Sequence, residues 1–255
     1  MKTNGNTVLI TGGSSGVGLA IAKAFLNLNN QAIICGRNQQ KLAQASQTCP
    51  GLHTFVCDIT KPNEVREMFT AIRSQFGNLN ILINNAGTIR FYDFIHDEDA
   101  FINGEQEIQT NLLGTLSVTK AALPLLLKTE ESAIVTISSI VALVPSPKML
   151  IYSSTKAALH SFSCSLRQQL QQTSVKVFEV MPPFVDTEAV KQINTSKVSP
   201  TEVAEALIKG LRTNNYEIRI GPAKALYFAH RFSPITAENI LKQIIATALK
   251  AKLTS

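Results

Sequence analysis

Short apolar runs rich in β-branched residues alternate with segments of helical periodicity along the whole chain. The first run covers residues 7–10, and the apolar residues that follow its turn share one helical face: Ala20, Ile21, Ala24, Phe25 and Leu28. Further strands are expected at residues 32–35, 54–57, 81–84, 134–138, 175–180 and 217–220. This alternation predicts the α/β class, with a doubly wound parallel sheet of about seven strands flanked by helices. A chain of 255 residues without a linker favours one domain, residues 1–255.

Two later segments carry further helical signals. Ser199, Pro200 and Glu202 predict a helix start, because serine and glutamate three residues apart form a capping box and proline suits the first helical position. Residues 237–253 form an amphipathic pattern with these apolar residues on one face: Ile240, Leu241, Ile244, Ile245 and Leu249. We expect this segment to dock onto the protein or onto a second copy, with a membrane-surface helix as the alternative.

Composition excludes several classes of protein. No apolar run approaches the ~18 residues that cross a bilayer, so no membrane span is expected. Residues 1–6 are polar and leave no room for a secretory signal, which predicts a cytoplasmic protein. The net charge is +6, but the Lys and Arg residues are scattered, so no nucleic-acid partner is expected. Neither the cysteines nor the histidines show ligand spacing, so we expect no metal, no disulfide framework, and histidines that are ordinary surface or core residues.

A glycine-rich turn, Thr11-Gly12-Gly13-Ser14-Ser15-Gly16-Val17-Gly18, directly follows the first strand. Glycines allow the tight turn, the approach of backbone to phosphate, and close packing of the helix on the sheet. The helix N-terminus adds free N–H groups, and serine hydroxyls can donate as well. The turn therefore predicts a site for the pyrophosphate of a dinucleotide, held by Gly12, Ser14, Ser15, Gly16, Val17 and Gly18.

The end of the second strand predicts which dinucleotide binds. Sites that prefer NAD place a carboxylate there to accept hydrogen bonds from the ribose, whereas sites for NADP offer an arginine to the 2′-phosphate. This chain has Gly36 and Arg37 at that place. We expect NADP (NADPH) as the cofactor, with NAD less favoured.

The spacing T-G-x-x-x-G-x-G resembles the short-chain dehydrogenase/reductase family, and further motifs of that family follow along almost the whole chain. They are Asp58, the segment Asn84-Asn85-Ala86-Gly87, Asn111, Ser139 and the Y-x-x-x-K pair of Tyr152 and Lys156. The resemblance implies a Rossmann-like fold and a homodimer or homotetramer. It implies pairing through helices around residues 111–127 and 154–170, whose exposed faces are expected to be apolar. It also implies cofactor contacts from Asp58, Asn85, Ala86, Gly87, Tyr152 and Lys156.

Tyr152 and Lys156 lie four residues apart, which places them on one helical face. A nearby ammonium favours a phenolate, so we expect Lys156 to lower the pKa of Tyr152 and make it a usable acid and base. The resemblance implies that Lys156 also binds the nicotinamide ribose, that Ser139 binds the substrate oxygen, and that Asn111 holds a water of the proton relay.

The segment after the sixth strand resembles the family's P-G-x-V-x-T segment, which implies nicotinamide contacts from Val185 and Thr187. Pro183 replaces the glycine, so the loop is expected to follow a different path. The double proline, together with Cys35-Gly36-Arg37-Asn38, resembles a DltE-like bacterial branch of the family.

These expectations combine into an NADP-dependent oxidoreductase that transfers a hydride between the cofactor and a small-molecule carbonyl or alcohol, through catalytic Asn111, Ser139, Tyr152 and Lys156. The alternative is a non-catalytic, NAD(P)-sensing binding protein on the same fold. An epimerase or dehydratase is a third possibility, although those relatives usually carry a larger substrate domain. Apolar residues in the loops around the expected pocket indicate a partly hydrophobic substrate.

Overall fold

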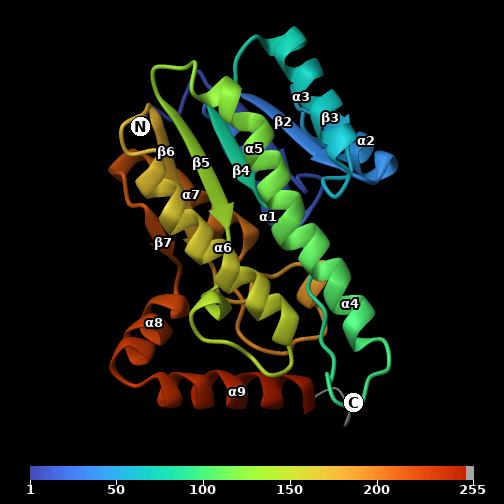
Figure 1. Ribbon diagram of the computed structural model, residues 1–255, viewed down its shortest axis with the longest axis vertical. Helices are drawn as coiled ribbons and strands as arrows, with labels where there is room; N and C mark the ends of the chain where they lie inside the picture. Colours follow the sequence, from blue (N-terminus) through green and yellow to red (C-terminus); the bar gives the residue numbers. More distant parts are fainter. Residues whose placement is uncertain (251–255) are drawn as a thin grey trace.

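The computed structural model describes residues 1–250, with side chains through residue 248. Within these residues one parallel sheet runs in the order β3-β2-β1-β4-β5-β6-β7 (Figure 1). The strands are β1 (Thr7–Thr11), β2 (Gln31–Gly36), β3 (His53–Val56), β4 (Ile81–Asn84), β5 (Ser132–Ile137), β6 (Val175–Met181) and β7 (Glu217–Arg219). Each expected strand is confirmed, with ends that differ by one or two residues at most.

Helices connect the strands and cover both faces of the sheet. They are α1 (Gly16–Leu26), α2 (Gln39–Thr48), α3 (Pro62–Phe76), α4 (Ala100–Glu107), α5 (Thr115–Leu126), α6 (Leu150–Gln169), α7 (Pro200–Thr213), α8 (Pro222–Phe232) and α9 (Pro234–Lys250). Three short turns complete the description: the π-helical η1 (Ile108–Gly114) and the 3-10 turns η2 (Ile140–Ala142) and η3 (Glu188–Val190). None of the described helices is long and apolar enough to cross a membrane.

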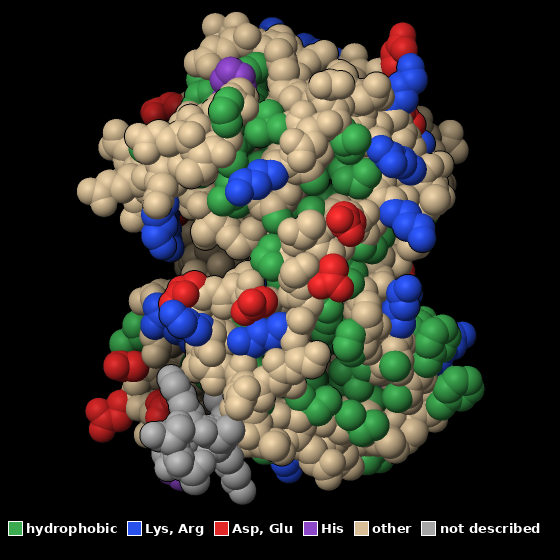
Figure 2. Space-filling view, turned by 180° about the vertical axis from the view of Figure 1, so that it is seen from behind, with side chains coloured by type: hydrophobic (Ala, Val, Ile, Leu, Met, Phe, Trp, Pro, Cys, Tyr) green, Lys and Arg blue, Asp and Glu red, His purple; other side chains and the backbone are tan. Residues whose placement is uncertain are grey.

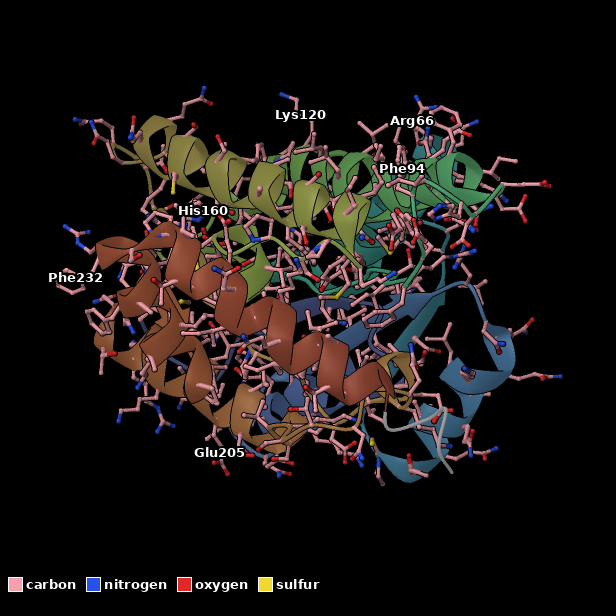
Figure 3. The ribbon with its side chains drawn as sticks, turned by 90° about the horizontal axis from the view of Figure 1, so that it is seen from below. Arg66, Phe94, Lys120, His160, Glu205 and Phe232 are labelled. Carbon is pink, nitrogen blue, oxygen red and sulfur yellow. The ribbon has the colours of Figure 1, made fainter. Side chains whose placement is uncertain are left out.

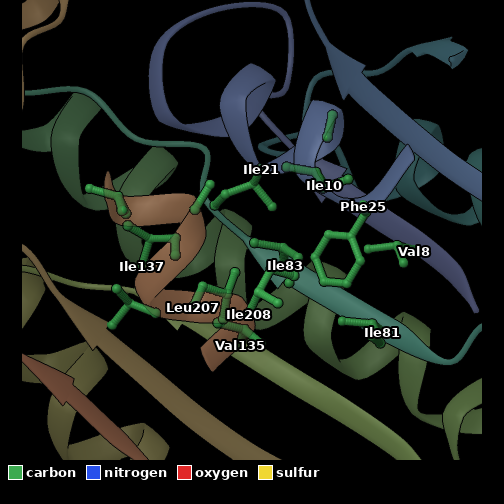
Figure 4. Packing of buried hydrophobic residues seen from close by; sticks show 14 of the residues in the cluster. Val8, Ile10, Ile21, Phe25, Ile81, Ile83, Val135, Ile137, Leu207 and Ile208 are labelled. Atoms are coloured by element: carbon green, nitrogen blue, oxygen red, sulfur yellow. The ribbon is translucent and has the colours of Figure 1, made fainter. Parts of the chain in front are cut away.

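Two apolar cores hold the helices against the sheet. Alternate strand residues such as Val8 and Ile10 pack under α1 and α7, with Phe25 and Leu207 fully buried among them (Figure 4). The strand residues whose side chains point to the opposite face of the sheet pack against α3, α5 and α6. Because both faces are covered, the strands are apolar almost throughout, as parallel sheets require.

The strand order reverses at β1, which pairs with both β2 and β4. Open α/β sheets bind ligands outside the carboxyl ends of the strands at such a reversal. The fold therefore places its ligand crevice beside the glycine turn that follows β1.

Helices α8 and α9 lie below the carboxyl ends of the strands in Figure 1. The inner face of α9 is buried against η2 and the loop before α6, through Ala237, Leu241 and Ile245. The expectation of a docked helix is thus confirmed, although residues 249–253 of the predicted pattern lie outside the described side chains. The capping box of α7 is confirmed too, since Ser199 Oγ accepts from Glu202 N at 3.1 Å and Ser199 N donates to Glu202 Oε2 at 2.7 Å.

Candidate active site

A cavity of about 910 Å³ lies at the carboxyl ends of β1, β2, β4, β5 and β6. It brings most of the predicted site residues together. Those that line it are Gly12, Ser14, Ser15, Gly16, Val17, Arg37, Asp58, Asn85, Ala86, Gly87, Ser139, Tyr152, Lys156, Val185 and Thr187. Two predicted residues, Gly18 and Asn111, are buried outside this lining.

The glycine turn has the backbone that a pyrophosphate requires. Gly12 and Gly16 have φ values of +64° and +53°, which L side chains rarely adopt. A Cβ at Gly18 would lie 2.6 Å from the Asn85 amide nitrogen, so no side chain fits there. Ser15, the N-cap of α1, makes no side-chain capping bond, so its hydroxyl is not committed to the helix N-terminus. These features fit a phosphate group at the start of α1.

Thr11 fastens the loop after β4 to the glycine turn, although it was not among the predicted site residues. Its hydroxyl oxygen accepts from the backbone N–H groups of Asn85 and Ala86, both at 3.0 Å. The Asn85 side chain returns the contact by donating to the Thr11 and Gly12 carbonyl oxygens at 2.9 and 3.1 Å. The turn and the loop therefore form one rigid wall. The sequence signal for Thr11 was its place as the first residue of the T-G-x-x-x-G-x-G motif.

Two cations stand at the end of the cavity bounded by β2 and β3. Arg37 is 62% exposed, with its guanidinium 4.0 Å from the Asp58 carboxylate. Lys41, which was not predicted, also lines this end from the first turn of α2. Asp58 itself accepts from the backbone and the hydroxyl of Thr60 at 3.0 and 2.8 Å. This end of the cavity therefore combines net positive charge with a fixed carboxylate.

Ser139, Tyr152 and Lys156 converge at the middle of the cavity. Ser139 follows β5, and its hydroxyl accepts from Val141 N at 3.3 Å. Tyr152 and Lys156 are one turn apart on α6, with the Lys156 Nζ 5.5 Å from the centre of the Tyr152 ring. Lys156 is buried, and its Nζ donates to the Ile137 carbonyl oxygen at 2.8 Å. The ammonium is therefore held between the end of β5 and the phenol.

The electrostatics of Ser139, Tyr152 and Lys156, called the trio below, differ from the sequence-based expectation. Lys156 was expected to lower the pKa of Tyr152, but burial raises that pKa, and the negative charge of Glu107 raises it further. The Ser139 hydroxyl acts in the opposite direction. Burial also lowers the pKa of Lys156 to about 8. Because desolvation is the dominant influence on this phenol, Tyr152 keeps its proton at neutral pH.

Two buried carboxylates act on the trio, and sequence reasoning missed both. Glu107 accepts from Arg90 N at 2.8 Å and from the Tyr92 hydroxyl at 3.2 Å. Glu179, in the middle of β6, pairs with His160 at 2.7 Å and raises the pKa of Lys156. His160 was expected to be an ordinary surface or satisfied core residue, and this pairing satisfies it and raises its pKa. The available signal for Glu179 was a carboxylate near the middle of the strand Val175–Met181, whose other residues, apart from Lys176, are apolar.

Glu179→Gln should move the basic limb of the profile of kcat/KM against pH to lower pH. Glu179 raises the pKa of Lys156, so its neutralisation lowers that pKa further and Lys156 loses its proton earlier as the pH rises. The measurement is kcat/KM for the cofactor against pH, which reports groups of the free enzyme. Glu131→Gln, a change at a surface carboxylate paired with Lys176, is the matched control and should leave the limb in place. An unmoved or alkaline-shifted limb in Glu179→Gln would show that Glu179 does not raise the pKa of Lys156.

Asn111 lies in the π-helical turn η1 and is fully buried. Its side chain accepts from Thr88 N at 2.7 Å and donates to Thr88 O at 2.8 Å and to Thr155 Oγ1 at 3.3 Å. These bonds fix the loop after β4 against α6. The expected contact of Asn111 with a water of a proton relay stays a prediction.

The loop after β6 reaches the glycine turn in spite of Pro183. Val185 forms a bridge with Val198, and Phe184 O accepts from Val198 N at 3.0 Å. Thr187 then lies so close to α1 that a Cβ on Gly16 would be 3.1 Å from Thr187 Cγ2. The double-proline loop therefore places Val185 and Thr187 in the cavity, as expected from the sequence.

Comparisons with known proteins agree with this geometry. Residues 6–198 match the family described as short chain dehydrogenase. The chain is 40% identical to the oxidoreductase DltE of Bacillus subtilis, over 86% of this chain and 89% of that protein. It is 31% identical to estradiol 17-beta-dehydrogenase 11 of Pongo abelii, over 99% and 85%. The structure of a short chain dehydrogenase from Burkholderia cenocepacia in complex with NADP superposes with a TM-score of 0.84 at 26% identity, covering 94% and 99%.

Proposed function

The chain belongs to the short-chain dehydrogenase family, and on that premise we propose that it transfers a hydride between NADP(H) and a carbonyl or hydroxyl group through Ser139, Tyr152 and Lys156. The observation that carries the proposal is that these three residues line the same cavity as the glycine turn. The relative solved with NADP supports a nicotinamide cofactor. A cytoplasmic location and a homodimer or homotetramer belong to the same proposal.

Each residue of the trio has a role that follows from its surroundings. The bound nicotinamide supplies or accepts the hydride. Ser139, buried at the end of β5, donates a hydrogen bond to the substrate oxygen. Tyr152 gives its proton to that oxygen during reduction, since its raised pKa keeps it protonated. Lys156 holds a positive charge beside the phenol while the proton moves.

The preference for NADP rests on the charges at the far end of the cavity. Arg37 and Lys41 both line the end where the second ribose of a dinucleotide lies in this type of fold. A guanidinium and an ammonium favour a 2′-phosphate over a hydroxyl, because charge-assisted hydrogen bonds are the stronger ones. We therefore assign Arg37, helped by Lys41, to the 2′-phosphate.

Turnover of NADPH with a panel of aldehydes and ketones tests the chemistry. We expect loss of NADPH absorbance with at least one carbonyl, and no loss without a carbonyl. The reverse reaction, reduction of NADP⁺ by the matching alcohols, should become faster as the pH rises, because oxidation needs Tyr152 to accept a proton. Tight NADPH binding without turnover in either direction would favour the NAD(P)-sensing alternative.

Of the two helices expected to pair in an oligomer, one has apolar side chains on its exposed face. The exposed residues of the segment 111–127 include Leu113 and Leu127. In contrast, the exposed face of α6 consists mainly of small residues, Ser154, Ala157, Ser161 and Ser165, so the expectation of an apolar face there was wrong. Self-association stays a prediction of the family resemblance.

A further inference from the structure

The cavity continues beyond the trio into a part that has no charged wall. Among the described residues that line the cavity, the charged ones are Arg37, Lys41, Asp58 and Lys156. The first three stand at the ends of β2 and β3, where the dinucleotide is proposed to bind, and Lys156 belongs to the trio. The described wall beyond the trio therefore offers no ionic partner to a carboxylate, a phosphate or an amine.

Helices α8 and α9 form the apolar wall of this part. Leu226 and Ala229 line it from α8, and Ile240, Leu241 and Ile244 line it from α9. Both helices lie after residue 198, where the match to the family ends, so this wall is a feature of the chain beyond the matched region. Apolar walls favour apolar ligand atoms, and an unpaired charge buried against them is costly.

The edge of the cavity is apolar as well. Ile240 and Ile244 line the cavity and are also 41% and 40% exposed, so these two side chains stand at its boundary with solvent. Hydrophobic side chains gather over the part of the molecule that contains α8 and α9, seen at the lower right of Figure 2. Phe232, at the end of α8, points away from the body in Figure 3. The apolar chain of a bound ligand that fills the cavity can therefore extend to its edge without meeting a described charge.

We propose that the substrate is an alcohol or carbonyl compound with an uncharged, apolar chain that runs from the trio along the α8–α9 wall. This inference rests on the proposed function for the reacting group. The apolar wall determines the polarity of the substrate chain that fits against it. We expect an acid, phosphate ester or amine at the far end of the substrate to bind more weakly, because the described wall offers it no ionic partner.

Calorimetric titration tests the proposal without turnover. The probes are 1-alkanols from butanol to decanol, added to the protein saturated with NADPH, which cannot accept a hydride from an alcohol. We expect the affinity to rise about three- to fourfold for each added methylene until the chain reaches the edge. The ω-hydroxy acids that are too short to reach the edge should bind at least about tenfold more weakly than the alkanols of the same length, because their carboxylate stays against the apolar wall. Equal affinity along the alkanol series, or equal affinity of acid and alkanol, would overturn the proposal.

A charge placed at the edge gives a second test. Ile244→Lys should weaken decanol binding and strengthen 10-hydroxydecanoate binding, because it adds a cation to the apolar end of the cavity. Ile235→Lys is the matched control, since Ile235 is on the same helix, is 72% exposed and does not line the cavity. It should change neither affinity, and an unchanged affinity for NADP⁺ shows that both variants fold. An Ile244→Lys variant that binds both probes like wild type contradicts the proposal.

The same probes separate this inference from the proposed function. Alkanols that bind with the expected slope but never reduce NADP⁺ would support the apolar wall and refute the hydride transfer. Turnover that is independent of chain length, or fastest with charged substrates, would support the hydride transfer and refute the apolar wall.

Discussion

Tyr152→Phe lowers turnover by about two to four orders of magnitude, the usual contribution of a positioned general acid, while NADPH affinity stays within a few-fold of wild type. The change removes one hydroxyl. The ring remains packed between the apolar residues around Met149 and Leu226, so the shape of the cavity is kept. Steady-state NADPH oxidation gives the turnover, and fluorescence titration gives the cofactor affinity.

The direction of the effect follows from the protonation state of Tyr152. At neutral pH the phenol is protonated and desolvated, so it is the group that can deliver a proton to the substrate oxygen. Ser139 can donate a hydrogen bond there, but a serine hydroxyl is a far weaker acid than a phenol. Loss of the tyrosine hydroxyl therefore leaves binding intact and removes the proton transfer.

Tyr216→Phe is the matched control for this experiment. It deletes a hydroxyl from a tyrosine that lies outside the cavity lining and packs on Phe178. We expect its turnover to equal that of wild type, and thermal unfolding should show that both variants fold. If Tyr152→Phe kept more than about a tenth of the wild-type turnover, Tyr152 would not be the proton donor.

The fold could be predicted because its determinants are local. The apolar run 7–10 and the helical spacing of Ala20 to Leu28 each report on a few neighbouring residues, and the capping box at Ser199 marks a helix start on its own. The convergence of the motifs follows from the same fold, since parallel strands end at one edge of the sheet. Gly12, Asn85 and Ser139 therefore meet although they are far apart in sequence.

The features that could not be predicted depend on distant partners and on burial. A carboxylate in a strand indicates a buried charge, but nothing in the sequence pairs Glu179 with His160 on α6. The pKa of Tyr152 was misjudged because its helical spacing from Lys156 carries no information on how deeply the phenol is desolvated. The α8–α9 wall likewise depends on docking: the pattern of residues 237–253 predicts an apolar face without naming the surface that it covers.

The wild-type protein should prefer NADPH to NADH by about 10- to 150-fold. One charge-assisted hydrogen bond from Arg37 to the 2′-phosphate contributes about 1.5–3 kcal/mol, which corresponds to this range. Arg37 is 62% exposed, so solvent screening places the ratio toward the lower end unless Lys41 adds to it. The two side chains together favour the phosphate over the free hydroxyl.

Gly36→Asp combined with Arg37→Ile should shift that preference toward NADH. Gly36 does not have a positive φ, and a Cβ built there comes no closer than 3.9 Å to Leu42 and Ser14, so the aspartate fits without backbone strain. Its carboxylate can accept hydrogen bonds from the ribose hydroxyl and repels a 2′-phosphate, while the isoleucine removes the guanidinium. The measurement is kcat/KM with NADPH divided by kcat/KM with NADH. Gly36→Ala adds the Cβ without the charge and should leave the ratio unchanged; a wild-type ratio near one, or a ratio that the double change does not move, would show that Arg37 does not read the phosphate.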